Sequence, residues 1–247
     1  MDVLIKMKIS PEGVTSHFET EPMLEIIYRD EHLIAINKPH GLLVHRSPIA
    51  ADASEFALQL LRDQIGQKVN PAHRIDRKTG GILLFALDKP AEIAMQQQFM
   101  ENRVHKKYLA IVRGHTPDQE EIDYPLRKEN GTLQDAFTKY TTLKRAELDI
   151  ALGAHATSRY SLVEAVPETG RMHQLRKHFS HIFHPIIGDR THGCNKQNKL
   201  FTETWDMNTM LLHASHLSFT HPVTGKNVQI DAGLQPEFAR VMQIMGW

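Results

Sequence analysis

The 247-residue sequence lacks several features by which classes of proteins are identified. It has a single cysteine, Cys194, so no intramolecular disulfide or cysteine-rich zinc site can form, and we expect a reducing, cytoplasmic environment. No apolar run approaches the roughly 20 residues of a membrane-spanning helix, and the N-terminus lacks the apolar core and cleavage site of a secretion signal. Walker A and G-x-G-x-x-G sequences are also missing, so nothing supports a nucleotide-cofactor fold.

The sequence also has no net charge, because 29 Lys and Arg balance 29 Asp and Glu. A value of zero first argues against a nucleic-acid partner, since phosphate binding depends largely on cationic side chains. The positive charge is nevertheless concentrated. Residues 70–113 carry eight Lys and Arg against four acids, and residues 171–199 carry six against Asp189 alone. Such blocks are typical of surfaces that bind polyanions but also of ordinary solvated surfaces, so charge alone leaves both interpretations open.

Hydrophobic patterning predicts an α+β fold. Apolar and β-branched runs bounded by turn residues predict strands over residues 24–28, 32–37, 82–87, 108–112, 159–166 and 227–230. Helices are predicted over residues 53–65, 90–102, 171–182 and 236–245. In the second of these, Asp88 is placed to cap the helix, and the apolar stripe consists of Ile93, Met95, Phe99 and Met100.

Because strands separate the helices without a regular βαβ alternation, we predict a mixed, largely antiparallel sheet with flanking helices. Residues 127–157 are polar and weakly patterned, which indicates an insertion or a hairpin with long loops. Residues 1–22 are interpreted as an N-terminal extension that is tied only loosely to the rest of the chain.

Residues 73–81 (HRIDRKTGG) combine a carboxylate, several cations and a glycine pair directly before an apolar strand. The positive charges of Arg74 and Arg77 favour the ionised form of Asp76, which makes this carboxylate a candidate nucleophile or base. The glycine pair permits backbone conformations, or a close approach of another chain, that other residues prevent. A charged surface turn with a salt-bridged aspartate has the same composition, so both interpretations stay open on these residues alone.

Residues 169–178 (TGRMHQLRKH) form a second cationic segment. If the segment is helical, Arg171 and Gln174 share one face with His178, while His173 and Lys177 lie on another with Arg176, because positions three and four apart are neighbours. Cations and free backbone N–H groups at the start of a helix suit a phosphate group. A solvated amphipathic helix explains the same pattern equally well.

The histidines at positions 173, 178, 181, 184 and 192 suggest a metal site at first sight. Their spacing does not match the H-E-x-x-H pattern, no carboxylate lies among the first four, and cysteine ligands are missing. We therefore predict no metal site and keep a metal-dependent hydrolase only as an alternative.

Residues 106–114 (KKYLAIVRG) place Tyr108 beside Lys106 and Lys107 at the start of a predicted strand. An aromatic ring flanked by cations can stack on a nucleobase while the cations hold the nucleic-acid backbone. A half-buried tyrosine in a strand is the commoner situation, so the pattern makes Tyr108 a candidate and no more.

In this order, the three segments resemble the landmarks of the RluA-type pseudouridine synthases. HRIDRKTGG is similar to the HRLDxxTSG loop of that family, KKYLAIVRG to its K-x-Y strand, and TGRMHQLRKH with HPIIGDRTHG to its C-terminal substrate motif. NKPHGLLVH and LLHASHLSFTHPVTG match further landmarks, so the resemblance covers about residues 23–247. Within the family, the compact chain most resembles a tRNA-directed branch.

The resemblance implies a catalytic domain over residues 23–247 with a cleft along the middle of its sheet. It implies an isomerase that converts a uridine of RNA to pseudouridine, by resemblance uridine 65 of tRNA, and that needs no metal or organic cofactor. Asp76 would be the catalytic aspartate, Arg176 its basic partner, and Tyr108 the residue that packs on the uracil and is assigned to the late deprotonation at C5.

Base flipping is part of the implied reaction, because a side chain cannot reach the glycosidic carbon of a stacked uridine. By resemblance, Arg74 would occupy the space that the flipped base leaves. The remaining predicted substrate-binding residues are Arg171, His173, Gln174 and Lys177.

The sequence departs from the family pattern at Gly80, where a serine is usual. Residues 1–22 are also too short for the RNA-binding domain that many relatives carry, which favours a compact structured RNA such as tRNA. We expect tRNA as the partner, a monomer without an obligate protein partner or membrane, and a cytoplasmic location. An rRNA-directed synthase of the same family and a catalytically silent RNA-binding protein are kept as alternatives.

Overall fold

The computed structural model describes residues 23–45 and 55–247. The predicted N-terminal extension, residues 1–22, and the first two residues of the predicted helix 53–65 lie outside these ranges. The helices are α1 (Ala57–Ile65), α2 (Lys89–Met100), α3 (Gln174–His181), α4 (Asn195–Trp205) and α5 (Pro236–Ile244). The strands are β1 (Ile26–Arg29), β2 (Leu33–Lys38), β3 (Asn70–Pro71), β4 (Gly80–Ala86), β5 (His105–Arg113), β6 (Gln119–Asp123), β7 (Leu126–Arg127), β8 (Leu133–Gln134), β9 (Phe137–Leu148), β10 (Ser158–Pro167), β11 (Leu212–Thr220) and β12 (Asn227–Asp231).

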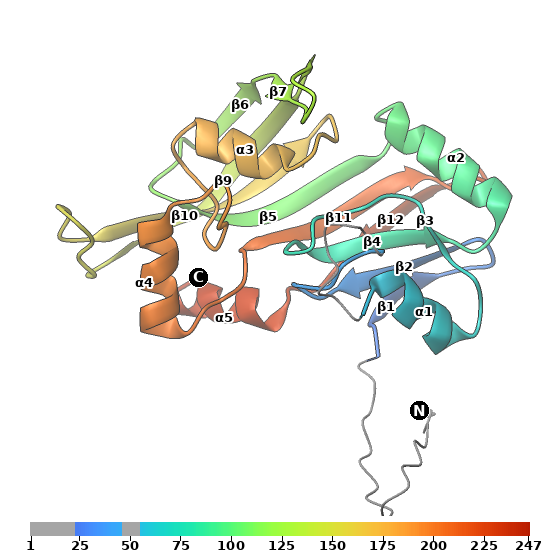
Figure 1. The fold of residues 1–247 in the computed structure, drawn as a ribbon, viewed down its shortest axis with the longest axis horizontal. Helices are drawn as coiled ribbons and strands as arrows, with labels where there is room; N and C mark the ends of the chain where they lie inside the picture. Colours follow the sequence, from blue (N-terminus) through green and yellow to red (C-terminus); the bar gives the residue numbers. More distant parts are fainter. Residues whose placement is uncertain (1–22, 46–54) are drawn as a thin grey trace, which may run out of the picture.

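One long sheet organises the fold (Figure 1). Its strand order is β1-β2-β4-β11-β5-β10-β9-β6, with β3 beside β4 and β12 beside β11, while β7 and β8 form a separate hairpin. The pair β4–β11 is parallel and the other pairs are antiparallel, which confirms the predicted mixed, largely antiparallel sheet. This order places β4, β11 and β5 in the centre, although they are far apart in the sequence.

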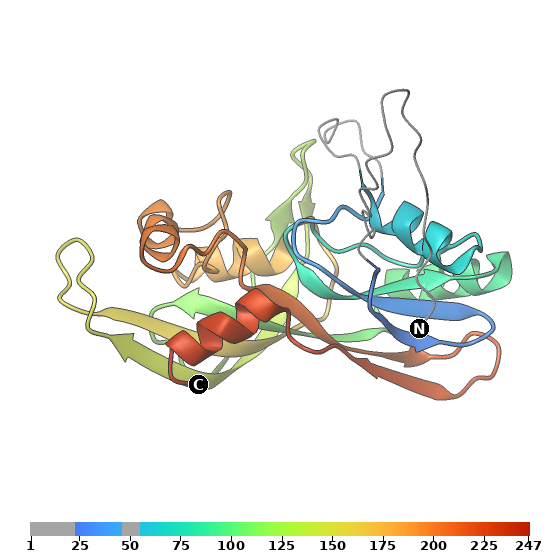
Figure 2. The ribbon, with the colours of Figure 1, turned by 90° about the horizontal axis from the view of Figure 1, so that it is seen from below.

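The helices pack against both faces of the sheet. Successive residues of a strand point to opposite faces, so the helix that each residue contacts shows which face that helix covers. Helix α2 shares a hydrophobic cluster with Leu33 of β2, and α1 shares one with the next residue, Ile34. In the other half of the sheet, α3 packs with Ala110 of β5, and α5 packs with Ile111. Figure 2 shows α1 and α2 at one end of the curved sheet and α3, α4 and α5 at the other. No helix within residues 23–45 and 55–247 has the length and apolar character needed to cross a bilayer.

Helix α2 begins as predicted but packs through different residues. Asp88 Oδ1 accepts a hydrogen bond of 2.8 Å from the N–H of Ala91, which caps the helix. Ile93 and Met100 of the predicted apolar stripe are exposed, so that part of the prediction is wrong. The buried positions are Ala91, Met95 and Gln98. Two of the three buried residues are thus a small alanine and a glutamine whose side chain bonds to the backbone of β11. Neither residue type is counted as a large apolar position when a helix face is predicted from sequence.

The polar segment 127–157 is more regular than the sequence predicts, because it contains the twelve-residue strand β9. β9 pairs with β10 from Thr138 to Leu148, and alternate residues near its start are buried. Its other residues are largely exposed, and lysine, threonine and glutamate are stable on a solvent-facing strand. The segment therefore lacks the apolar alternation by which a strand is predicted from sequence. Helix α4 was likewise missing from the prediction, because only Gln197 and Phe201 of its residues are buried.

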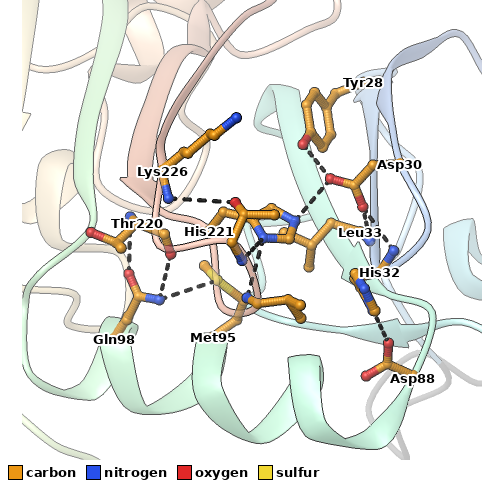
Figure 3. A network of polar contacts seen from close by, with 12 residues as sticks. Tyr28, Asp30, His32, Leu33, Asp88, Met95, Gln98, Thr220, His221 and Lys226 are labelled. Atoms are coloured by element: carbon orange, nitrogen blue, oxygen red, sulfur yellow. Dashed lines mark hydrogen bonds and ion pairs between the residues drawn. The ribbon is translucent and has the colours of Figure 1, made fainter.

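A closed polar network ties the β1–β2 turn to the β11–β12 hairpin (Figure 3). The carboxylate of Asp30 accepts two turn N–H groups at 2.8 Å, the hydroxyl of Tyr28, and Nε2–H of His221 at 3.0 Å. Nδ1 of His221 accepts two N–H groups of the turn that follows it, at 3.2 and 3.1 Å, which assigns the ring proton to Nε2. We call Tyr28, Asp30 and His221 the Asp30 network; each of its polar ring and carboxylate atoms has a partner within the protein.

Candidate active site

The three motif segments meet at one pocket of about 260 Å³. It lies between the loop that joins β3 to β4, strand β5 and the start of α3. Seven of the predicted site residues line it: Arg74, Asp76, Tyr108, Arg171, His173, Gln174 and Arg176. The eighth, Lys177, is half-buried on α3 outside this lining. Residues 100 positions apart in the sequence, such as Asp76 and Arg176, are thus brought to one cavity near the centre of the sheet.

The loop that carries Asp76 is held from behind by the segment that follows β2. Lys38 is fully buried, and its Nζ donates to the carbonyl oxygen of Arg77 at 3.1 Å and to two carbonyls of its own segment at 2.9 and 2.8 Å. Burial lowers the pKa of Lys38 to about 7. His40 Nδ1 lies 2.8 Å from the carbonyl oxygen of Lys78, and the N–H of Gly41 donates to Arg77 at 2.9 Å. These bonds satisfy the buried loop carbonyls and fix the position of Asp76.

The glycine pair that ends this loop is required by close packing. Gly81 has a φ of +101°, and a Cβ there would lie 2.2 Å from the carbonyl oxygen of Ala214 in the parallel neighbour β11. A Cβ at Gly80 would lie 2.8 Å from Nε2 of His40. The departure from the family pattern at Gly80 therefore has a local reason, because His40 occupies the room that a serine side chain would need.

Asp76 is one end of an ionic bridge that continues into the protein. Nη1 of Arg176 donates to Oδ2 of Asp76 at 3.1 Å, while its Nε and Nη2 donate to the two oxygens of Asp189 at 2.8 Å each. The side chains of Arg176 and Asp189 are 7% and 1% exposed, whereas that of Asp76 is 28% exposed. The bridge therefore anchors Arg176 in the interior and leaves the Asp76 carboxylate facing the pocket.

Asp189 is a site residue that sequence reasoning missed. Burial alone would raise its pKa, but hydrogen bonds from Arg176 and from the N–H groups of Thr191 and His192 hold the pKa below its usual range. Asp189 thus stays ionised and fixes both the orientation and the charge of Arg176. The signal was present in the sequence, because Asp189 is the only acid in the cationic block 171–199.

Tyr108 reaches the pocket from β5, next to the parallel pair at the centre of the sheet. Burial, and then the charge of Asp76, raise the pKa of Tyr108, so its phenol is protonated at neutral pH. Lys106 lines the same pocket, and burial lowers its pKa. No carboxylate of the described residues forms an ion pair with Lys106, which leaves a cation available at this wall.

One wall of the pocket is aromatic and uncharged. Nε2 of His73 accepts the N–H of Leu84 at 3.1 Å, and the ring stacks on Phe99 with 4.6 Å between the ring centroids. Burial, and then the charge of Lys106, lower the pKa of His73 to about 3. The His73 ring is therefore neutral at physiological pH and serves as a flat wall beside the catalytic loop.

The start of α3 is shaped by Gln174 rather than by a helix from residue 171. Oε1 of Gln174 accepts the N–H of Arg171 at 3.0 Å and the hydroxyl of Thr169 at 2.7 Å, and its Nε2 donates to two oxygens at the start of β9 at 3.0 Å each. The helix begins at Gln174, three residues later than predicted, because His173 has a left-handed backbone with a φ of 56°. The amide of Gln174 is thus engaged within the protein, while Arg171 and His173 remain at the pocket.

The histidines of the second segment do not gather around one point. His173 and His192 lie 3.0 Å apart between Nδ1 and Nε2, but in residues 23–45 and 55–247 no group of three or more His, Cys, Asp or Glu side chains is placed to hold a metal ion.

This arrangement suits a flat, uncharged ring that carries an anionic group. The ring would lie between Tyr108, Leu212 and the His73 wall, while Arg74, Lys106 and Arg171 supply positive charge around it. The partly exposed Asp76 carboxylate faces the same space, and Arg176 Nη1 lies 3.1 Å from its Oδ2. The pocket can therefore bring a carboxylate to a carbon or proton of a bound nucleotide.

Comparison with known proteins agrees with this chemistry. Residues 32–181 match the family model described as RNA pseudouridylate synthase. The chain is 45% identical over 236 residues to tRNA pseudouridine synthase C of Vibrio cholerae, covering 91% of this chain and 97% of the relative. It is 46% identical over 234 residues to tRNA pseudouridine synthase C of Haemophilus ducreyi, with coverage of 91% and 96%.

Two solved human structures share the fold. RNA pseudouridylate synthase domain containing 1 superposes with a TM-score of 0.70 at 24% identity, covering 90% of this chain and 94% of that one. RNA pseudouridylate synthase domain containing 4 superposes with a TM-score of 0.69 at 25% identity, with coverage of 90% and 93%. Together with the sequence matches, they show that the chain belongs to the RNA pseudouridylate synthase family.

Proposed function

We propose that this protein isomerises a specific uridine of tRNA to pseudouridine, with Asp76 as the catalytic carboxylate. The observation that carries the proposal is the bridge Asp76–Arg176–Asp189, which presents one partly exposed carboxylate to a pocket lined by Tyr108 and cations. The choice of tRNA rests on relatives named tRNA pseudouridine synthase C, which this chain matches over nearly their whole length. By resemblance to their branch, the target is uridine 65.

The reaction conserves every atom of the nucleotide. Asp76 either attacks C1′ of the target uridine or removes its 2′ proton, and the bond between C1′ and N1 breaks. The detached uracil rotates and C5 bonds to C1′, and at this step either the bond from C1′ to Asp76 breaks or the 2′ proton returns, according to the route. The proton on C5 is then lost to water while N1 takes up a proton, so the composition of the nucleotide is unchanged. Both routes need an ionised carboxylate, and Arg176 supplies a charged donor to Oδ2 of Asp76.

Tyr108 is assigned to the uracil. Its protonated phenol packs against the base, and burial and Asp76 both disfavour the phenolate. Tyr108 therefore relays the C5 proton: its oxygen accepts the proton from C5 while its own O–H proton passes to water. This transfer comes late, because the C5 proton is labile only after C5 has bonded to C1′.

Binding requires that the target base leave its stack, which costs a few kcal/mol. Arg74 is exposed at the pocket and is assigned to the space vacated by the base. Arg171, His173 and Lys177 are assigned to the surrounding RNA, with Gln174 holding Arg171 in place. Binding should therefore weaken as salt rises, because the cations release counterions from the phosphates.

In this proposal residues 23–247 act as one catalytic domain, as a monomer in the cytoplasm. The continuous ten-stranded sheet supports one domain, and the single cysteine suits a reducing cytoplasm. Size-exclusion chromatography with light scattering tests the monomer, and a mass of two chains at micromolar concentration would contradict it.

Tritium release from RNA that contains uridine labelled at C5 tests the function. We expect release from tRNA transcripts, none from ribosomal RNA, and none from either RNA with Asp76→Asn, although that variant folds and binds tRNA. Release from ribosomal RNA alone would indicate the rRNA-directed alternative. Binding of tRNA without release by the wild type would indicate a silent RNA-binding protein, and full activity in Asp76→Asn would refute the mechanism.

A further inference from the structure

Two histidine rings meet beside the catalytic aspartate. Nδ1 of His173 lies 3.0 Å from Nε2 of His192, and the rings are 5.2 Å apart in an edge-to-face arrangement at 69°. The other nitrogen of His173, Nε2, lies 3.9 Å from Oδ2 of Asp76. His173 lines the pocket, whereas His192 lies behind it in the segment that follows Asp189.

The contact between the two rings holds a single proton when both are neutral. Burial lowers the pKa of each ring, and the nearby charges of Arg176 and Lys177 act in the same direction, against the opposing effects of Asp76 and Asp189. Neutral imidazole has one N–H donor and one bare acceptor nitrogen. The hydrogen bond therefore runs either from His192 to His173 or from His173 to His192.

The carboxylate of Asp76 favours one of these two arrangements. If His173 donated through Nδ1, its bare Nε2 lone pair would face Oδ2 of Asp76 across 3.9 Å, which places two acceptors against each other. If His192 donates through Nε2, the proton of His173 lies on Nε2 and its N–H faces the carboxylate. Electrostatics favours the second arrangement, in which His192 is the donor.

The backbone positions both rings. His173 has a φ of 56°, which is uncommon outside glycine and asparagine and costs free energy that the surrounding structure must offset. This conformation brings its ring into the pocket directly before α3. His192 is held by its N–H, which donates to Oδ1 of Asp189 at 3.1 Å. The same aspartate thus orients Arg176 and the histidine pair.

We propose that His192 fixes the tautomer of His173, so that Nε2–H of His173 faces the pocket as a hydrogen-bond donor to an oxygen of the target nucleotide beside Asp76. The distance of 3.9 Å from Nε2 to Asp76 is too long for a hydrogen bond, so this donor is free for substrate. The substrate part of the proposal rests on the function proposed above, but the tautomer does not. His192 is a positioning residue that acts through His173.

Long-range ¹⁵N–¹H spectra of histidine-labelled protein without RNA test the tautomer. We expect His173 to carry its proton on Nε2 at pH 7.5, with the signals assigned from His173→Gln and His192→Gln. In His192→Leu the proton should redistribute between the two nitrogens of His173. A His173 proton on Nδ1 in the wild type, or an unchanged Nε2–H in His192→Leu, would overturn the proposal.

Kinetics test the consequence for the reaction. Gln can place an amide N–H near the position of Nε2 of His192, whereas Asn is too short and Leu has no donor. We expect kcat/KM for tRNA to fall about 3- to 10-fold in His192→Leu and His192→Asn, as for the loss of one hydrogen bond, and to stay within about twofold in His192→Gln.

Equal activity of the three variants, or losses that follow only their thermal stability, would overturn the positioning role. A wild type that is inactive on tRNA would instead refute the proposed function, and the spectra would still decide the tautomer.

Discussion

The Asp30 network and the Asp76 site are built from the same components but are completed differently. Asp30 accepts hydrogen bonds from two backbone N–H groups, Tyr28 and His221, so its carboxylate is fully engaged (Figure 3). Within the described residues, the carboxylate of Asp76 accepts a hydrogen bond from Arg176 alone. One network therefore holds two hairpins together, whereas the other leaves acceptor capacity for a substrate.

The two carboxylates differ in how many of their hydrogen-bond acceptor positions are filled within the protein. Arg176 and Asp189 are about as deeply buried as His221, and both oxygens of Asp189 accept hydrogen bonds, whereas at Asp76, where the bridge reaches the pocket, only Oδ2 accepts one within the described residues. A buried pair whose hydrogen bonds are complete stabilises the fold. A carboxylate with free lone pairs at a pocket can bind or react with a substrate. Substitutions in the two networks should consequently separate stability from activity.

The largest effect is expected from Arg176→Gln. It removes the donor to Asp76 and leaves Asp189 buried without its charge partner, so we expect destabilisation of about 3–5 kcal/mol and a fall in kcat of about 10²–10³-fold. Denaturant unfolding and tritium release measure the two effects. The control is Arg240→Gln, which breaks a surface pair with Glu237 and should cost less than about 1 kcal/mol. Similar results for the two variants would contradict the role of the bridge.

A smaller effect is expected from Asp189→Asn. The amide keeps the shape of the side chain but loses the charge that holds Arg176, so we expect a fall in kcat/KM of about 10- to 100-fold and a loss of about 1–3 kcal/mol. Tritium release at saturating and limiting tRNA measures the first quantity. Unchanged turnover in this variant would show that Asp76 alone orients Arg176.

Asp30→Asn should affect stability but not turnover. Loss of the ionised acceptor weakens the bonds to Tyr28 and His221, and we expect a cost of about 1–3 kcal/mol, seen as a decrease in Tm of several degrees. Asp231→Asn is the matched control, because Asp231 pairs with His216 at 2.7 Å but is 78% exposed. A loss of activity in Asp30→Asn beyond the unfolded fraction would erase the distinction between the two networks.

A further effect grows as the pH falls. The pKa values of His73 and His213 are lowered to about 3 and about 4, mainly by burial, so the unfolded chain binds protons below pH 6.5 that the folded chain does not. Stability should fall as the pH drops from 6.5, with a slope of up to about 1.4 kcal/mol per pH unit for each histidine.

The carboxylates titrate later. The pKa values of Asp30 and Asp189 are lowered, so their contribution is complete above the unfolded value near 3.8 and is lost only below it. Urea unfolding between pH 7.5 and 4.5 should show the histidine slope, and His73→Gln should reduce it. A flat stability over this range would contradict the assignment of neutral, buried histidines.

Sequence reasoning placed Asp76, Tyr108 and Arg176 in one candidate site, because ordered motifs and a family resemblance select them without any knowledge of contacts, and all three line the pocket. It did not select Asp189 or His192. Asp189 matters through its contact with Arg176, and His192 through its contact with His173. Each contact joins α3 or its start to a later turn, and hydrophobic periodicity does not predict contacts of this kind. The same limit applies to elements.

Strands with one apolar face or a continuous apolar run, such as β2 and β4, were predicted because burial requires their composition. β9 and α4 are not predicted from the sequence, because each buries only a few side chains and its exposed face is polar. Neither element therefore shows a clear hydrophobic pattern. Lys38 shows the reverse case: a fully buried lysine is unexpected from composition, and three carbonyl oxygens explain it.

The most direct test compares Asp76→Asn with Asp30→Asn, two identical changes of carboxylate to amide in the two networks. Tritium release from tRNA should be measured per folded molecule, with the folded fraction taken from denaturant unfolding of the same samples. We expect no release above background from Asp76→Asn at near wild-type stability, and wild-type release per folded molecule from Asp30→Asn at reduced stability. Measurable turnover by Asp76→Asn, or an equal loss of turnover in both variants, would contradict the assignment of Asp76 as the catalytic carboxylate.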